Sequence, residues 1–411
     1  MASQNCDQCF LNPGSFSYWI DQFCIELNAQ RYSSLTIKGY RDSARHFAVW
    51  LKSTGIPIGG IDARVVQRFA AHHCQCPGGR QYQRISPKYA RRARKFVVFL
   101  QNAGVVPIPL KEVPPACPIL DDYQHWLRIH RGLSESTIAR HLRIVNKLLP
   151  ELGMETHNYD ATRVRAVVHK WREQTKSADL RIITSTLRSY LRFLAGAGLC
   201  RPNLDHAIPP VLQWRLSSLP RYLAAADVER VIASCDVLSK GRLRDRAILL
   251  LLARLGLRAG DVAGLQLGDI DWNSGILQLS GKARRKVRLP LPQEVGDALL
   301  AYIEQERPST SQDEAVFVGV IAPYRPFAQS SYISGIVANA LKRAGISDAP
   351  SNGANLLRHS AATSMLRSGA TLEAVGTVLR HSSLDMTAHY AKVDIMMLEQ
   401  IAQPWPGELV C

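Results

Sequence analysis

The residues whose types could do chemistry gather in the last third of the chain, where a basic series leads to one tyrosine. The series contains Arg358 and His359 in NLLRHSAAT, His381 in LRHSS and Tyr390 in TAHY. A second arginine, Arg258 in LGLRAGD, lies well upstream. Arginine holds phosphate oxygens through paired N–H donors, and a tyrosine oxygen can form a covalent enzyme intermediate. The set therefore indicates phosphoryl transfer on an anionic phosphodiester.

Tyr390 is the predicted nucleophile. A phenol has a pKa of about 10, so attack at neutral pH needs a nearby positive field or a base. Arg258 and Arg358 would supply that field and stabilise charge in the transition state. His381 should hydrogen-bond the phosphate. Each residue alone could be an ordinary surface or core residue, but their joint spacing favours the catalytic interpretation.

These segments resemble the catalytic domain of the tyrosine recombinases, also called the phage integrase family. The family's first arginine box matches Gly256–Leu257–Arg258 followed by Asp261. Its second arginine box matches Asn355 to Thr363, and its Leu-Gly-His-Ser-Ser box matches Leu379 to Ser383. The resemblance is strongest over residues 220–395. We expect Asp261 to position Arg258 or residue 355. His359 follows Arg358 directly, family members also have a histidine there, and it is interpreted as a packing residue.

Two departures from the family pattern affect the predicted site. Arg380 replaces the glycine of the last box. Asn355 replaces a histidine credited with accepting the tyrosine's proton or bonding the phosphate. Because asparagine cannot take up a proton at pH 7, we expect positioning to survive at Asn355. General-base assistance would be lost or would pass to water or another histidine, and cleavage would be slower. The competing interpretation is a degenerate partner that binds DNA without cutting it.

The family's hairpin lysine matches Lys282, which lies between two β-prone runs, 276–280 and 287–291. The resemblance implies that Lys282 is the general acid that protonates the departing 5′-oxygen. The alternative is a solvated, charged hairpin tip. Several basic neighbours leave the identity of the proton donor open: Arg284, Arg285, Lys286 and Arg288.

Composition bounds the class of protein and its partner. The chain has 411 residues, which suggests two or three domains, and its 46% hydrophobic and 21% charged content is that of a soluble globular protein. Lysine and arginine number 51 against 34 acidic residues, a net charge of +17. Such a surplus favours a polyanionic partner, and the resemblance implies that this partner is double-stranded DNA. A basic protein that merely stays soluble is the plainer alternative.

Cysteine usage and hydropathy predict a cytoplasmic protein. The nine cysteines are odd in number and follow no disulfide framework. We find no signal peptide and no apolar run long enough to cross a bilayer, so no membrane partner is expected. Two segments contain residue types that zinc accepts as ligands: Cys6 with Cys9, and His72 to Cys76. Free thiols are the favoured interpretation, so the predicted site contains no metal and no cofactor.

The chain reads as two N-terminal helical bundles followed by a catalytic domain. Predicted boundaries are 1–112, 113–207, a proline-rich linker at 208–219, and 220–411 with a C-terminal tail. The second bundle resembles the family's core-binding domain, of the SAM-like type, and the first looks like a duplicate of it. The fold class is therefore mainly α, with a small antiparallel β-sheet in the C-terminal domain.

Apolar spacing in both bundles predicts amphipathic helices with one buried stripe. The stripes are Ile37, Ala44, Phe47 and Leu51 in the first bundle, and Ile138, Val145, Leu148 and Leu152 in the second.

Glycine and cap signals predict where helices end and begin. The Ala-Gly pairs 103–104 and 197–198 should end helices. In the C-terminal domain, Asp227 should cap a helix from about 228. Further helices are expected over 242–255, 329–344, 356–368 and 371–380, with Tyr390 on another short one.

The sequence thus predicts a site-specific tyrosine recombinase, the integrase or transposase of a mobile element. The family implies cleavage of one strand at a time through a 3′-phosphotyrosine, followed by attack of the freed 5′-hydroxyl on the partner strand. It also implies a tetramer on two duplexes, of one chain or of related recombinases. No carboxylate cluster for two metal ions accompanies the boxes, so neither Mg²⁺ nor ATP should be needed. The alternatives are a weakened DNA-binding partner of another recombinase and a type IB topoisomerase.

Overall fold

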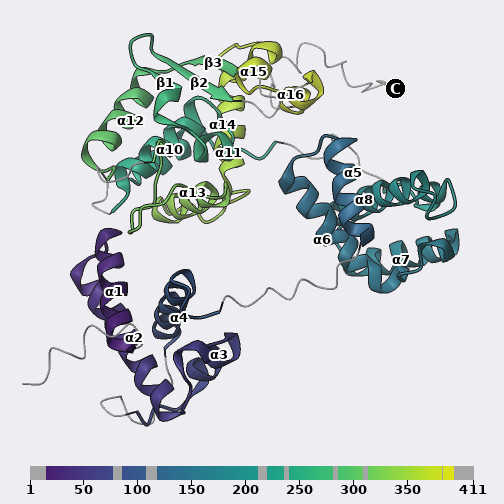
Figure 1. The fold of residues 1–411 in the computed structure, drawn as a ribbon. Helices are drawn as coiled ribbons and strands as arrows, with labels where there is room; N and C mark the ends of the chain where they lie inside the picture. The colour runs from purple at the N-terminus through teal and green to yellow at the C-terminus, as the bar shows by residue number, and fades with distance from the viewer. Residues whose placement is uncertain are drawn as a thin grey trace, which may run out of the picture. The chain divides into compact units, whose positions relative to one another are not determined.

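The structure is a computed structural model that describes residues 15–76, 86–107, 118–211, 220–235, 240–280, 286–308, 313–381 and 383–392. It is mainly helical with one three-stranded antiparallel sheet, which confirms the predicted fold class (Figure 1). Pro107–Arg215 forms one compact unit, and the residues on either side of it are grouped as the other. None of the helices in the described part is both long and apolar enough to cross a bilayer.

The two N-terminal helical regions have the same order of elements. The first consists of α1 Phe16–Ala29, α2 Ser34–Ser53, a 3₁₀ turn, α3 Ala63–Ala71 and α4 Pro87–Asn102. The second consists of α5 Pro118–Ile129, α6 Glu135–Leu152, a 3₁₀ turn, α7 Ala161–Gln174 and α8 Ser177–Gly196, followed by a further 3₁₀ turn at Leu204–Ala207.

Capping is also alike in the two regions. The carboxylates of Asp62 and Asp160 each accept a backbone N–H at 2.7 Å and begin α3 and α7. Gly104 and Gly198 follow the last turns of α4 and α8 with φ of 73° and 71°. This left-handed conformation suits glycine and confirms the predicted helix ends. Common descent of the two regions, and their division into domains, stay predictions.

Each helical region buries the stripe that its apolar spacing predicts. In the first, Ala44, Phe47 and Leu51 have no exposed surface, while Ile37 is partly buried against the same core. In the second, Val145, Leu148 and Leu152 are fully buried and Ile138 nearly so. The amphipathic helices expected from the sequence are confirmed, and each region has its own hydrophobic core.

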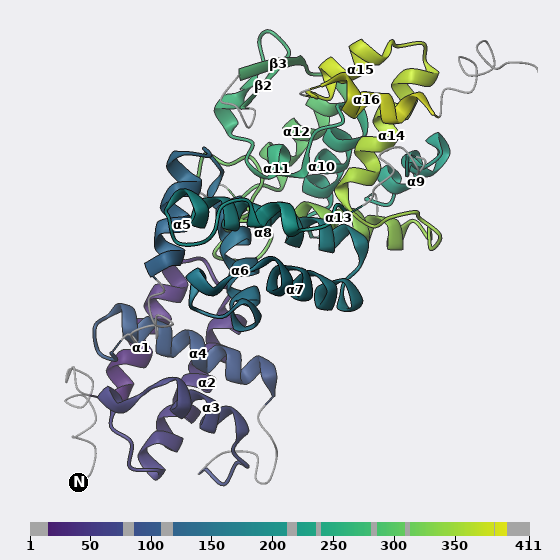
Figure 2. The same ribbon diagram turned by 90° about the vertical axis from the view of Figure 1, so that its right-hand side faces the viewer.

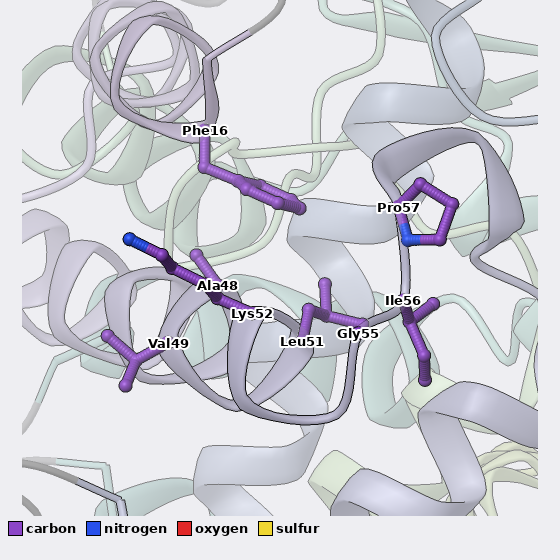
Figure 3. A pocket seen from close by; sticks show the side chains of 8 residues that line it. All are labelled: Phe16, Ala48, Val49, Leu51, Lys52, Gly55, Ile56 and Pro57. Carbon is purple, nitrogen blue, oxygen red and sulfur yellow. The ribbon is translucent and has the colours of Figure 1, made fainter.

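A small apolar pocket lies where α1 approaches the end of α2 (Figure 3). Phe16 of α1 faces the last turn of α2, and Ile56 and Pro57 close the far side. Its volume is about 470 Å³. Lys52 is the one charged residue among those that line it, so the pocket offers little catalytic chemistry.

The C-terminal region is built around one buried helix. Its elements are α9 Ala225–Ala233, α10 Arg242–Arg254, α11 Ala259–Ala263, β1 Ile270–Asp271, β2 Ile276–Ser280, β3 Lys286–Pro290, α12 Gln293–Gln305, α13 Ser331–Arg343, α14 Ala354–Arg367, α15 Leu372–Val378 and α16 Leu384–Ala391. Helix α10 packs against α12 on one side and α14 on another (Figure 2). Its residues from Ala247 to Leu252 have no exposed surface. The middle of this helix, which is apolar on all sides, therefore supports the elements that carry the site.

The two strands of the predicted hairpin are confirmed as an antiparallel pair, with Leu277 opposite Leu289. The basic turn predicted between them lies outside the described residues. The predicted cap at Asp227 is wrong. Helix α9 begins after Ala224, and Asp227 lies inside its first turn, where it pairs with Arg230 at 2.8 Å. An acidic residue stabilises the positive end of the helix dipole from that position as well, so the residue type alone does not fix the start.

Candidate active site

One cleft in the C-terminal region contains most of the predicted site. Its volume is about 800 Å³, and residues from α11, α13, α14 and α16 line it. Arg258, Asn355, Arg358, His381 and Tyr390 all belong to this lining. The last predicted member, Lys282, falls outside the described residues.

Arg358 is held deep in the cleft by two backbone carbonyls. Its side chain extends from α14 and the residue is only 6% exposed. One Nη donates to the carbonyl of Gly256, and the other donates to the carbonyl of Leu379 at 2.6 Å. Burial, with the charge of Arg258 beside it, lowers the pKa of Arg358 to about 10. The guanidinium is still charged at neutral pH and is fixed in one orientation.

Gly256 is required by the close packing at this point. Its φ is 58°, and a Cβ there would lie 2.5 Å from the side chain of Leu379. A larger residue would be strained at this φ, and the end of the Leu379 side chain would have to move. The glycine of the first arginine box therefore lets the second arginine reach its carbonyl.

Arg258 is the N-cap residue of α11 and is held by the residues that follow α15. Its Nη2 donates to the carbonyl of Arg380 at 2.8 Å, and its backbone N–H donates to the Asp261 carboxylate at 3.1 Å. This contact is consistent with the predicted role of Asp261 in positioning Arg258. The two guanidiniums bond successive carbonyls, those of residues 379 and 380. Two positive charges therefore converge on one wall of the cleft.

Arg380 adopts the left-handed conformation that the family's glycine would suit, with a φ of 56°. Its side chain is 7% exposed and forms an ion pair with Asp261. Its Nε and Nη1 are buried and have no hydrogen-bond partner among the described residues. The replacement therefore places a third guanidinium close to the two predicted arginines.

Tyr390 lies on α16 with its hydroxyl bonded to a histidine. The residue is 2% exposed, and its Oη lies 2.6 Å from Nδ1 of His359. Burial raises the pKa of Tyr390, and the charge of Arg358 opposes that rise. Burial, reinforced by His389 and Arg358, lowers the pKa of His359, which favours the neutral ring. A neutral His359 can accept a proton from the phenol.

Sequence reasoning missed His359, which it assigned to packing. The signal was present in the helical spacing, since residues 355 and 359 are four apart and share a face of α14. Asn355 has no imidazole, and the next residue on that face of α14 that has one is His359. Asn355 lines the cleft with an exposed side chain.

His381 lies against the nucleophile. Its ring is stacked on that of Tyr390, with centroids 6.3 Å apart and planes within 6°. Its Nδ1 lies 2.8 Å from the Thr387 hydroxyl, which leaves Nε2 as the nitrogen available to a phosphate. Burial, followed by the charges of Arg358 and Arg258, lowers its pKa to about 4. A neutral imidazole here can act as a hydrogen-bond donor at pH 7.

Comparison with known proteins identifies the family of this chain. Residues 221–396 match the phage integrase family. The putative integrase/recombinase y4rA of Sinorhizobium fredii is 34% identical over 411 residues, which cover 98% of each chain. Tyrosine recombinase XerD of Mycobacterium tuberculosis is 29% identical over 308 residues, 70% of this chain and 96% of its own.

A solved structure has a similar fold. It is that of the site-specific recombinase XerH bound to its palindromic difH substrate, in a post-cleavage complex. The TM-score is 0.54 at 20% identity, over 73% of this chain and 99% of that one. Together with the near full-length relative, these matches show that the chain belongs to the phage integrase family of tyrosine recombinases.

Proposed function

We propose that this protein is a site-specific DNA recombinase that cuts and rejoins strands through a 3′-phosphotyrosine. One observation carries the proposal: the Tyr390 hydroxyl bonds an imidazole in the same cleft that presents the guanidiniums of Arg258 and Arg358. A nucleophile, a proton acceptor and two fixed cations are what attack on a phosphodiester needs.

In the proposed reaction, Tyr390 Oη attacks the scissile phosphorus while His359 Nδ1 takes the phenolic proton. The bond from phosphorus to the 5′-oxygen breaks, and that oxygen leaves as a hydroxyl after receiving a proton. Lys282 is the proposed donor, from the resemblance alone. Arg258 and Arg358 neutralise the charge that builds on the non-bridging oxygens. The reverse attack, by the 5′-hydroxyl of a partner strand, completes the exchange.

We also propose that the reaction needs neither a metal ion nor ATP. Among the described residues that line the cleft, Asp261 is the one carboxylate, and it is engaged by Arg380 and by the backbone of Arg258. Two-metal catalysis uses several free carboxylates. The phosphotyrosine ester keeps the energy of the broken bond, so rejoining requires no further source.

We propose double-stranded DNA as the partner. The proposed role is that of the integrase or transposase of a mobile element. The net charge of +17 supports a polyanionic ligand, and relatives are named integrase/recombinase. The recombinase XerH is bound to a palindromic difH substrate in its solved structure. A tetramer on two duplexes, formed by this chain or with related recombinases, follows from the family resemblance.

Covalent capture tests this function without knowledge of the target. A pool of nicked, end-labelled duplexes of randomised sequence would be incubated with the protein, and adducts that survive denaturation would be isolated and sequenced. We expect adducts enriched in one motif for wild type and for Tyr332→Phe, an exposed tyrosine, and none for Tyr390→Phe. Binding without any adduct would instead indicate the DNA-binding partner. Adducts without sequence preference, with relaxation of any supercoiled plasmid, would indicate a topoisomerase.

A further inference from the structure

A second group of chemically active side chains lies in the first helical region. It consists of His46 on α2, His72 directly after α3, and Cys74 and Cys76 in the segment that follows. One ligand atom from each, a ring nitrogen or a sulfur, lies within 4.8 Å of all the others. Both cysteines are buried and both histidines are partly buried. Residues from two separate elements thus converge on one point.

The spacing of these atoms is close to that of a tetrahedral zinc site. Zinc lies about 2.3 Å from sulfur and about 2.0–2.1 Å from nitrogen, so neighbouring ligand atoms are about 3.3–3.8 Å apart. Here His46 Nε2 lies 3.3 Å from Cys74 Sγ, and His72 Nε2 lies 3.9 Å from Cys76 Sγ. The other pairs are separated by at most 4.8 Å, so shifts of up to about 1 Å would close the set around an ion.

The surroundings of His72 prepare one nitrogen for a metal. Its Nδ1 lies 2.6 Å from the carbonyl oxygen of Phe69, to which it donates. That bond fixes the tautomer and leaves the lone pair on Nε2, the atom nearest to Cys76. A ligand histidine whose other nitrogen is held by a backbone carbonyl is typical of protein zinc sites.

Aromatic rings fix the orientation of both histidines. His46 packs edge-on against Phe69, with centroids 5.4 Å apart, and also contacts Tyr89. The His72 ring lies 5.1 Å from Phe69 and 5.5 Å from Trp50. These contacts restrain the imidazoles and keep solvent from one side of the group.

We propose that His46, His72, Cys74 and Cys76 bind one Zn²⁺ ion. Four protein ligands fill the tetrahedron, so the ion would be structural rather than catalytic. It would join the middle of α2 to the end of α3 and to the segment that leads to α4. On binding, the two thiols lose their protons to solvent and become thiolates.

This inference changes the interpretation that the sequence favoured, in which Cys74 and Cys76 were free thiols. His46 was absent from that reasoning because it lies on another helix, and only folding brings it to the cysteines. Cys6 and Cys9, the other suggested ligands, fall outside the described residues.

The test is the metal content of the full chain, purified under reducing conditions after growth with added zinc. Mass spectrometry of the metal should find about one zinc per chain in wild type. Cys74→Ser and His46→Ala should lower that content at least about tenfold. The matched controls, His73→Ala beside the site and Cys24→Ser in the same core, should retain it. The measurement uses no DNA, so its outcome is independent of the proposed recombinase activity.

A third variant separates ligation from folding. His46→Cys removes the imidazole but keeps a zinc ligand, so it should retain the ion while His46→Ala does not. Replacing zinc with Co²⁺ should give the visible absorption of a tetrahedral thiolate site in wild type and in His46→Cys. The proposal would be overturned if wild-type protein contained no zinc, or if Cys74→Ser and His46→Ala kept full zinc content. It would also be overturned if the two control variants lost as much zinc as these ligand variants.

Discussion

The phenolic oxygen of Tyr390 lies 2.6 Å from Nδ1 of His359, the residue directly after the second arginine of the site. Residue 359 is one helical turn beyond Asn355, on the same face of α14. The proton acceptor that the family is credited with having at the first position is therefore available at the second. This relationship offers an answer to how the chain could cleave DNA with an asparagine at 355.

The first prediction concerns that acceptor. His359→Gln keeps a polar side chain but removes the proton-accepting ring, so single-turnover formation of the covalent adduct should slow by about 10²–10⁴-fold. His389→Gln is the control, because His389 also packs against Tyr390, with centroids 6.0 Å apart. DNA affinity should be unchanged in both. An unaltered cleavage rate in His359→Gln would show that His359 is not the base.

The same acceptor predicts a pH dependence. The pKa of His359 is lowered from 6.5 by burial, so its basic form is present at neutral pH and is lost as the pH falls through the lowered value. The cleavage rate of wild type should therefore stay level near pH 7 and decline only below pH 6.5. His381, with a pKa of about 4, titrates in the same acid range. The decline that His359→Gln abolishes is the part due to His359.

Restoring the family's histidine should complement the loss. Asn355→His adds an imidazole to the lining of the cleft, and in the His359→Gln background it should recover about tenfold or more of the lost cleavage rate. In wild type the same change should have a smaller effect, because an acceptor is already present. Asn352→His, an exposed neighbour before α14, serves as the control. If Asn355→His changed the cleavage rate equally in both backgrounds, residues 355 and 359 would not share the role of proton acceptor.

The pair of Arg380 and Asp261 predicts strong coupling in stability. Asp261→Asn leaves the buried Arg380 charge uncompensated and should lower the free energy of unfolding by about 3–5 kcal/mol. In the Arg380→Gly background, where glycine suits the φ of 56°, the same change should cost about 1 kcal/mol or less. Urea unfolding of the four proteins measures the coupling. Glu229→Gln, at the more exposed pair with Arg254, should cost about 0–1 kcal/mol.

Salt dependence tests the basic surface of α6. Arg140, Arg143 and Lys147 are exposed and spaced along one face of this helix. If each contacts a phosphate, replacing all three with glutamine should reduce the slope of log K against log salt by about 3. Replacing the exposed Lys170 and Arg172 of α7 tests whether the loss is specific to α6. Affinity that does not change with salt in wild type would contradict binding through the phosphate backbone.

Local sequence patterns predicted much of the fold, because helix ends and buried apolar stripes depend on residues that are close in the sequence. Glycine at 104 and 198 ends helices since it tolerates positive φ, and the apolar stripes bury since their period matches the helix. Asp227 failed as a cap because an acidic residue stabilises several positions in a first turn.

The site was predicted as a set of residues but not as a set of contacts. The boxes identified Arg258, Arg358, His381 and Tyr390, and the cleft contains all four. The spacing of residues 355 and 359 places them on one face of α14, but the bond from His359 to Tyr390 joins two helices, so this spacing alone does not predict it. The same holds for His46 and Cys74, which meet only because α2 packs beside the end of α3.

Both predicted arginines donate to the carbonyls of residues 379 and 380, and His381 bonds Thr387 within α16. These bonds hold the stretch from Leu379 to Tyr390 at its start, through the two carbonyls, and again near its end, through Thr387. One inserted residue in α16 would turn the tyrosine by about 100° around the helix axis, away from its acceptor. Residue types can drift along this stretch during evolution, as Arg380 illustrates, whereas its length is constrained by geometry.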